Sequence, residues 1–222
     1  MTPLSATDGL TASALACTLG TRRLFTGLDF TVARGQWLEL AGDNGSGKST
    51  LLRIVAGLMA PLAGSLSWAG RSVRRGDPIW HACLLYQGHA SGWKEAFGAR
   101  ENLLAQAALD LPGLARAERE RRVDAALDRA GVARQRHLPF ARLSAGQRRR
   151  IALARLALGA RPLWLLDEPN TALDTQGQSL FAELLDAHLA TGGCAIVATH
   201  LPVAASGPRA ALRLQAPPET RP

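Results

Sequence analysis

Apolar residues recur along this chain in two patterns, one typical of buried strands and one of helices. Short apolar runs bounded by Gly or Pro predict strands at Leu28–Val32, Trp37–Ala41, Ala82–Tyr86, Leu163–Leu166 and Ala195–Thr199. Helical periodicity predicts helices over Lys48–Leu58, Ala115–Ala130, Ser144–Leu158 and Gln176–Thr191. Because strands alternate with helices, we expect an α/β fold with a mostly parallel sheet, whose ligands bind beyond the carboxyl ends of the strands.

The longest interval without a strand pattern runs from about residue 98 to residue 159. It shows only helical periodicity, with Arg and Glu on the outer faces and Pro112 and Pro139 in the breaks. We interpret this interval as a helical insertion. The chain is therefore expected to form one domain over residues 1–222, with a core from residues 1–97 and 160–222 and a helical subdomain over about 98–159.

Composition indicates an ordinary globular protein, because 47% of the 222 residues are hydrophobic and 20% are charged. No apolar run approaches the roughly 18 residues of a membrane helix, and the start of the chain lacks a secretion signal. We therefore expect the chain to stay in the cytosol. Its three cysteines, Cys17, Cys83 and Cys194, are widely spaced in apolar sequence, which predicts buried, reduced thiols.

The net charge of +8 is compatible with an anionic partner such as nucleic acid or a membrane surface. Only Lys48 and Lys94 are lysines, however, and the other 24 basic residues are arginines in a chain rich in Ala, Gly and Leu. That composition is equally typical of a GC-rich genome. The charge therefore leaves a solvated basic surface and a dedicated anionic partner both open.

The segment from Gly42 to Thr50 carries the pattern G-x-x-x-x-G-K-[ST] between a predicted strand and a predicted helix. Glycine lets a phosphate approach successive backbone N–H groups, and the helix N-terminus adds unpaired donors. Lys48 supplies a charge to the outer phosphates, and the Ser49 hydroxyl can coordinate Mg²⁺. We predict binding and hydrolysis of ATP with Mg²⁺, and nucleotide contacts from Gly42, Asp43, Asn44, Gly45, Ser46, Gly47, Lys48, Ser49 and Thr50.

A second candidate lies where the apolar strand of residues 163–166 ends in two carboxylates, Asp167 and Glu168. Such residues emerge at the same sheet edge as the glycine loop. Asp167 is suited to hold Mg²⁺ through water, and Glu168 to orient and activate the water that attacks the γ-phosphate. The alternative is an acidic pair that only complements a helix dipole.

A third pattern is LSAGQ, Leu143 to Gln147, which we call the signature. Ser144 and Gln147 have the spacing of a capping box that opens a helix, and the small residues Ala145 and Gly146 leave that N-terminus open to an anion. The segment resembles the LSGGQ signature of the ABC ATPase family, with Ala145 in place of the first glycine.

The resemblance extends over essentially the whole chain, in the order of glycine loop, signature, acidic strand end, Thr171–Asp174 and His200. It implies a P-loop NTPase of the ABC type, with an antiparallel β part beside the parallel core. It also implies that His200 contacts the γ-phosphate and steadies Glu168. In a head-to-tail homodimer, Ser144, Ala145, Gly146 and Gln147 of a second copy would close over the γ-phosphate.

Two positions are not settled by the resemblance. Family members usually stack adenine on an aromatic residue, and this sequence has Leu19 at that place. The glutamine of the loop that reaches the metal is either Gln87, directly after a predicted strand, or replaced by His89. Gln87 is favoured, because its amide oxygen can ligate Mg²⁺ and order water.

More detailed features resemble the CcmA family, the ATP-binding subunits of the cytochrome c biogenesis haem exporter. These are the short chain, LSAGQ followed by RRRIALARL, the segment GHASGWK and the TALD after LLDEP. The resemblance implies a haem-transporting translocase subunit, peripheral on the cytoplasmic face of the bacterial inner membrane. Its partners would be CcmB-like and CcmC-like integral membrane subunits, and its hydrolysis would export haem or release a haem-loaded chaperone.

Three other functions were compared with this one. Another ABC exporter, for a drug, lipid or lipoprotein, shares all the ATPase motifs. A DNA-repair ABC ATPase would need a long coiled-coil insertion, but the interval before the signature lacks heptads and is interrupted by Pro61, Pro78, Pro112 and Pro139. A translation-associated ABC factor carries two cassettes, and this chain has one. We therefore expect no nucleic-acid partner.

Overall fold

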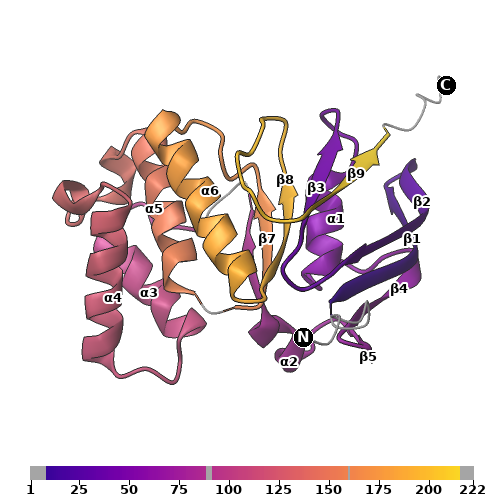
Figure 1. Cartoon of the computed structure of the whole chain (residues 1–222), viewed down its shortest axis with the longest axis horizontal. Coiled ribbons are helices and arrows are strands. Elements are labelled where there is room, and N and C mark those ends of the chain that lie inside the picture. Colours follow the sequence, from indigo (N-terminus) through magenta and orange to yellow (C-terminus); the bar gives the residue numbers. More distant parts are fainter. Residues whose placement is uncertain (1–8, 89–91, 160, 216–222) are drawn as a thin grey trace.

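A computed structural model of the chain describes residues 9–88, 92–159 and 161–215. His89, the alternative to Gln87, lies outside these residues. Two β-sheets form the frame (Figure 1). The five-stranded sheet is parallel with the order β6-β7-β8-β3-β9, formed by Leu84–Gln87, Leu163–Asp167, Cys194–Ala198, Trp37–Gly42 and Arg209–Leu214. The four-stranded sheet is antiparallel with the order β2-β1-β4-β5, formed by Arg22–Val32, Leu10–Leu19, Ala63–Trp68 and Arg71–Ser72.

The helices separate into two groups. Helices α3, α4 and α5 gather at one end of the molecule, and the antiparallel sheet forms the other end (Figure 1). Between β6 and β7, the described residues form helices and short turns and no strand. The helices are α1 Lys48–Val55, α2 Pro78–Cys83, α3 Ala99–Asp110, α4 Arg116–Arg129, α5 Ala145–Leu158 and α6 Thr175–Ala190. The predicted α/β architecture is confirmed.

The parallel sheet is covered on both faces, which explains why its strands read as continuous apolar runs. Along β7, Leu163 and Leu165 pack with α1 and the antiparallel strands, whereas Trp164 and Leu166 pack with α3 to α6. Every residue of β7 is buried, including Asp167 at its end. The strand therefore delivers a carboxylate from an apolar interior to the edge of the sheet.

Three predicted boundaries were wrong by two residues or more. The strand predicted from Leu28 begins at Arg22, because its first residues pair with β1. Ala82 and Cys83 lie in α2 and not in a strand, because the Asp77 carboxylate accepts a hydrogen bond from the Ile79 N–H (2.9 Å) and caps that helix. The helix that begins at Lys48 ends at Val55 and does not reach Leu58. Gly57, with φ of 73°, ends the helical path.

The cysteine prediction was partly wrong. All three cysteines are free, and Cys17 and Cys194 are buried, but Cys83 is only partly buried. Burial raises the pKa of the Cys194 thiol to about 12.

No helix among residues 9–88, 92–159 and 161–215 is both long and apolar enough to cross a bilayer.

Candidate active site

A cleft of about 450 Å³ opens where the glycine loop, the carboxyl end of β7 and the β1–β2 hairpin meet. It thus lies at the edge of the sheet predicted for ligands. Four segments distant in sequence line it: Leu19, Arg22, Leu24, Asn44, Gly45, Gly47, Lys48, Ser49, Thr50, Asp167, Glu168, Thr171 and His200. The cleft therefore brings together Lys48, Asp167, Glu168 and His200, as the sequence predicted.

The glycine loop connects β3 to α1 and depends on its glycines. Gly42, Gly45 and Gly47 have φ of 149°, 79° and 102°, conformations that L residues rarely adopt. Lys48 is 9% exposed, and its ammonium donates to the carbonyl oxygens of Gly42 (2.6 Å) and Asp43 (3.1 Å). The ammonium is thus held across the loop, and the side chain of Ser46 is fully buried with no partner for Oγ among the described residues. A loop of this shape fits a phosphate chain.

The two carboxylates that end β7 occupy different environments. Asp167 is 3% exposed, and Glu168 begins a turn with a left-handed φ of 52°. The Glu168 N–H still donates to the Ala198 carbonyl (2.8 Å), so the turn starts from a paired strand. One oxygen of Glu168, Oε2, accepts a hydrogen bond from Thr171 Oγ1 (3.1 Å) and lies 2.8 Å from His200 Nδ1. Two side chains, Thr171 and His200, therefore hold the same oxygen of Glu168.

A buried hydrogen bond joins the two segments that hold this pair. Thr199, next to His200, donates from its hydroxyl to Asn170 Oδ1 (2.8 Å) and accepts from the Leu201 N–H (3.0 Å). Both Thr199 and Asn170 are at most 3% exposed. Since the bond is shielded from water, it holds the turn after β8 against the turn after β7.

The residues predicted to hold a metal ion lie near the same edge. Gln87 pairs with Leu166, one residue before Asp167, and is 4% exposed. Neither polar atom of its side chain has a hydrogen-bond partner among the described residues. Ser49 and Asp167 line the cleft itself. The described residues contain no group of three or more His, Cys, Asp or Glu side chains placed to hold a metal ion.

The signature residues do not line this cleft. Ser144 and Gln147 form the predicted capping box, in which the Gln147 N–H donates to Ser144 Oγ (3.2 Å) and the Ser144 N–H donates to Gln147 Oε1 (3.0 Å). Ser144 and Ala145 are exposed. A Cβ on Gly146 would lie 3.4 Å from the Ala172 carbonyl, so the signature adjoins the Thr171–Asp174 segment of its own chain.

Sequence reasoning missed two side chains near the carboxylates. Thr171 was noted only as the start of a segment, and nothing in its sequence indicated the bond to Glu168. Arg149 was noted only as part of the RRRIALARL segment that follows the signature. Burial lowers the pKa of this guanidinium, and the charges of Glu168 and Asp167 act in the opposite direction. The charge of Arg149 therefore interacts favourably with both carboxylates.

Comparison with known proteins agrees with this geometry. The profile of the ABC transporter family matches residues 25–171, which include the glycine loop, the signature and both carboxylates. The chain belongs to the ABC transporter family. Membership in this family means that the chain binds ATP and hydrolyses it.

Relatives within the ABC transporter family are similar along most of the chain. "Cytochrome c biogenesis ATP-binding export protein CcmA" of Cupriavidus pinatubonensis is 50% identical over 86% of this chain and 83% of its own. The protein of the same name from Pseudomonas aeruginosa is 44% identical over 86% of this chain and 92% of its own. The resemblance to the CcmA family is confirmed.

Solved structures of the ABC transporter family share the fold. A dimeric bacterial ABC transporter cassette superposes with a TM-score of 0.83 at 22% identity, covering 93% of this chain and 94% of that one. An ATP-binding subunit of an ABC transporter superposes with a TM-score of 0.75 at 27% identity, covering 86% of this chain and 80% of that one.

Proposed function

We propose that this chain is the ATP-hydrolysing subunit of a membrane ABC complex for cytochrome c biogenesis, a translocase that exports haem or releases a haem-loaded chaperone. The observation that carries the ATPase role is the cleft in which Lys48 and the Glu168–His200 pair face one space. The cytochrome c role rests on similarity to proteins named for that process over 86% of the chain.

In this proposal, the backbone of Gly42 to Thr50 and the Lys48 ammonium bind the phosphates of ATP. Ser49, Asp167 and Gln87 would hold Mg²⁺, and the two unpartnered polar atoms of Gln87 support this assignment. When bound, Mg²⁺ would neutralise charge on the outer phosphates. The Lys48 ammonium is already held in the loop by the carbonyls of Gly42 and Asp43, so it needs little reorganisation to bind the outer phosphates.

Glu168 would orient and activate the attacking water. Its Oε2 is occupied by Thr171 and His200, which leaves Oε1 to accept a proton from that water. His200, whose side chain is 58% exposed, can face the γ-phosphate at the same time. His200 is thus assigned the role of holding Glu168 and sensing the γ-phosphate.

The site is completed by a second copy. Since Ser144, Ala145, Gly146 and Gln147 lie outside the cleft of their own chain, a head-to-tail homodimer would bring them to the γ-phosphate of the partner. The capping box supports this role, because it leaves the N-terminus of α5 exposed and ordered. A dimeric cassette of the same fold supports the arrangement.

The division of the chain into a core and a helical subdomain follows from these roles. We assign residues 1–97 and 160–222 to a nucleotide-binding core and residues 98–159 to a helical signature subdomain within one ABC domain. The helices between β6 and β7 support this division.

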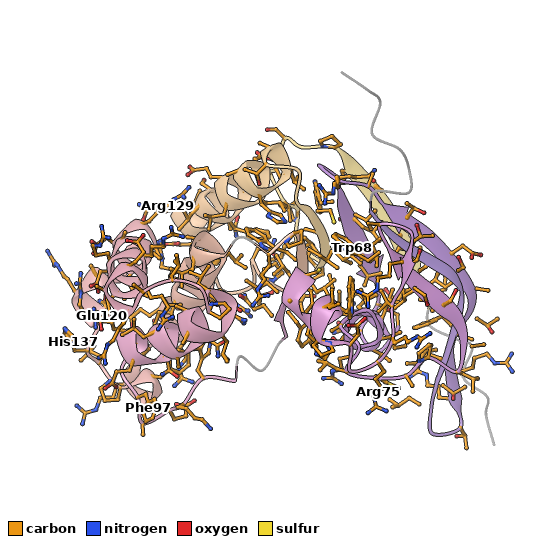
Figure 2. The ribbon with its side chains drawn as sticks, turned by 90° about the horizontal axis from the view of Figure 1, so that it is seen from below. Trp68, Arg75, Phe97, Glu120, Arg129 and His137 are labelled. Carbon is orange, nitrogen blue, oxygen red and sulfur yellow. The ribbon has the colours of Figure 1, made fainter. Side chains whose placement is uncertain are left out.

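The membrane subunits, CcmB-like and CcmC-like, would dock beside the helical end, on the cytoplasmic face of the inner membrane. Phe97, labelled at that end in Figure 2, is 49% exposed. The backbone before it is anchored, because Asn102 accepts from the Lys94 N–H (2.8 Å) and donates to the Lys94 carbonyl (2.9 Å). An exposed aromatic ring on an anchored segment suits a protein interface.

Pull-down from solubilised membranes of the source bacterium tests this function. We expect tagged chain to recover CcmB-like and CcmC-like subunits, with ATPase activity in the recovered complex. Recovery of a drug, lipid or lipoprotein permease would contradict the cytochrome c role and leave the ATPase role intact. Recovery of ribosomes or DNA at physiological salt, without membrane subunits, would contradict the transport role altogether.

A further inference from the structure

A second cavity, of about 430 Å³, lies at the edge of the parallel sheet opposite the cleft. Its lining includes Pro162 and Gly193, the residues directly before β7 and β8, whereas the cleft lies at the carboxyl end of β7. We call it the basic cavity, because Arg34, Arg129 and Arg161 also line it. The basic cavity shares no lining residue with the cleft, and its volume is that of a small-molecule site.

The three guanidiniums reach the basic cavity from separate parts of the chain. Arg34 lies between β2 and β3, Arg129 (Figure 2) is the last residue of α4, and Arg161 precedes β7. No Asp or Glu is among the described residues that line the cavity. Since like charges around one space repel one another, an anion that enters this space lowers the free energy of the folded protein.

The surroundings compensate two of these charges only weakly. The Arg129 guanidinium approaches Glu183 at 4.0 Å, and the Glu183 side chain is 65% exposed, so this ion pair contributes little. The Arg161 guanidinium donates to the backbone carbonyls of Ala82 and Leu109, which orient it without neutralising its charge. Arg161 Nε is buried and has no hydrogen-bond partner among the described residues.

Two stacked rings form part of the wall. The rings of Trp164 and His188 lie 3.9 Å apart, and their exposed fractions are 2% and 8%. Gly193 makes room for this stack, because a Cβ at that position would overlap His188 Cε1. Trp164 Nε1 is buried and has no hydrogen-bond partner within the described part of the chain. Buried indole N–H groups usually have a partner, so this donor points to an acceptor that enters the cavity.

We propose that the basic cavity binds a small organic polyanion, whose carboxylate or phosphate groups pair with the three arginines and whose body lies against Trp164. Guanidinium groups suit both oxyanions, since they donate two parallel hydrogen bonds. Inorganic phosphate alone would fill only a small part of the space, whereas an organic body can also contact apolar wall residues such as Leu184. The inference goes beyond the proposed function, because no residue of this cavity binds or hydrolyses ATP there.

Trimesate, a benzene ring with three symmetrically placed carboxylates, is a suitable probe, and calorimetric titration measures its binding. The protein is first saturated with ADP and Mg²⁺, so that the glycine loop is occupied. Wild type should bind one trimesate per chain, and the uncharged tricarboxamide of the same ring should bind at least about tenfold more weakly. The triphosphonate of the same ring distinguishes the two oxyanions, because the tighter of the two charged probes identifies the groups that the arginines prefer.

Substitutions in the wall locate the bound probe. Arg34→Gln and Arg129→Gln each remove one charge from an exposed side chain, and each should weaken trimesate about tenfold. Arg116→Gln is the matched control, because Arg116 is exposed on the same helix as Arg129 and does not line the cavity. Trp164→Phe keeps a ring but loses the N–H, and it should weaken trimesate about fivefold. The urea midpoint without probe shows whether each variant is folded.

Several results would overturn the polyanion site. Equal binding of trimesate and the tricarboxamide would mean that charge is not recognised. Equal losses in Arg129→Gln and Arg116→Gln would mean that trimesate only follows the net charge of the protein. Wild type that binds neither charged probe would contradict the site directly. Failure to bind ADP, with trimesate binding intact, would instead contradict the proposed function and leave the basic cavity as a polyanion site.

Discussion

Glu168 occupies a left-handed backbone conformation, with φ of 52°, that costs a non-glycine residue about 1 kcal/mol or more. The conformation turns the side chain away from the direction of β7 and toward Thr171 and His200. The hydrogen bond from the Glu168 N–H to Ala198 offsets part of that cost. Strain is thus kept at the one residue that the proposed chemistry uses as a base.

Replacing Glu168 by Gln tests this assignment. We expect Glu168→Gln to bind ATP as tightly as wild type, to lose at least about 100-fold in kcat, and to accumulate as an ATP-bound dimer in light scattering. Glu183→Gln is the control, because Glu183 is exposed on α6 outside the cleft. Turnover of Glu168→Gln at the wild-type rate would rule out a catalytic base at this position.

At the scale of elements, Arg155 ties α5 to two neighbours. Its guanidinium donates to Asp110 at the end of α3 (2.9 Å) and to the Tyr86 carbonyl of β6 (3.2 Å). The side chains of Arg155 and Asp110 are 15% and 7% exposed. The link joins the signature helix to the strand that carries Gln87.

We expect Arg155→Met to destabilise the fold by about 3 kcal/mol, because it leaves the Asp110 carboxylate buried without its partner. The measurement is the shift of the urea midpoint. Arg116→Met, which removes an exposed i,i+4 pair with Glu120, should leave the midpoint unchanged. Equal effects of the two substitutions would show that the Arg155 link contributes no more than a surface pair.

The elements that sequence analysis found are those whose pattern is local. The apolar runs at β3, β7 and β8 predicted strands, because strands buried on both faces need nearly continuous apolar sequence. β1 was missed, since its residues have mixed exposure and its pairing with Val32 and Trp68 is decided far along the chain. Helix α2 was missed although Asp77 and Pro78 carried a start signal.

The residues of the candidate site were predicted to about the same extent as the helices and strands. Motifs and their order predicted Lys48, Asp167, Glu168 and His200 as site residues, because each motif has fixed local spacing, and all four line the same cleft. The neighbours Thr171, Arg149 and Arg22 were not found, since their contacts arise only when separate segments meet in the fold. No local pattern distinguishes Arg22 from Arg23.

At the scale of the whole molecule, His188 is a buried titratable group that does not line the cleft. Its ring stacks on Trp164 at 3.9 Å, and Nε2 lies 3.0 Å from the Cys194 carbonyl oxygen. Burial lowers the pKa of His188, and the hydrogen bond to Cys194 opposes that shift only in part. The folded state therefore resists a proton that the unfolded chain accepts.

The pKa of His188 is lower in the folded state than in the unfolded chain. The contribution of His188 to the free energy of unfolding is therefore complete above about pH 6.5, and it is lost as the pH falls from there toward the lowered pKa. We expect His188→Phe, which can keep the stacking, to lose less stability than wild type between pH 7 and pH 5, measured by urea midpoints. His137→Phe is the control on an exposed ring (Figure 2) and should retain the wild-type slope. Identical slopes for all three proteins would show that His188 does not contribute.

The exposed position of the signature has a consequence for regulation in the cell. If a second copy completes each catalytic site, as proposed above, a dilute chain should hydrolyse little ATP, because two copies must meet before either can work. A membrane complex that tethers two copies replaces this chance encounter by a high effective concentration. Under the proposed function, assembly of the complex would control hydrolysis, so that ATP would be used where the cargo is handled.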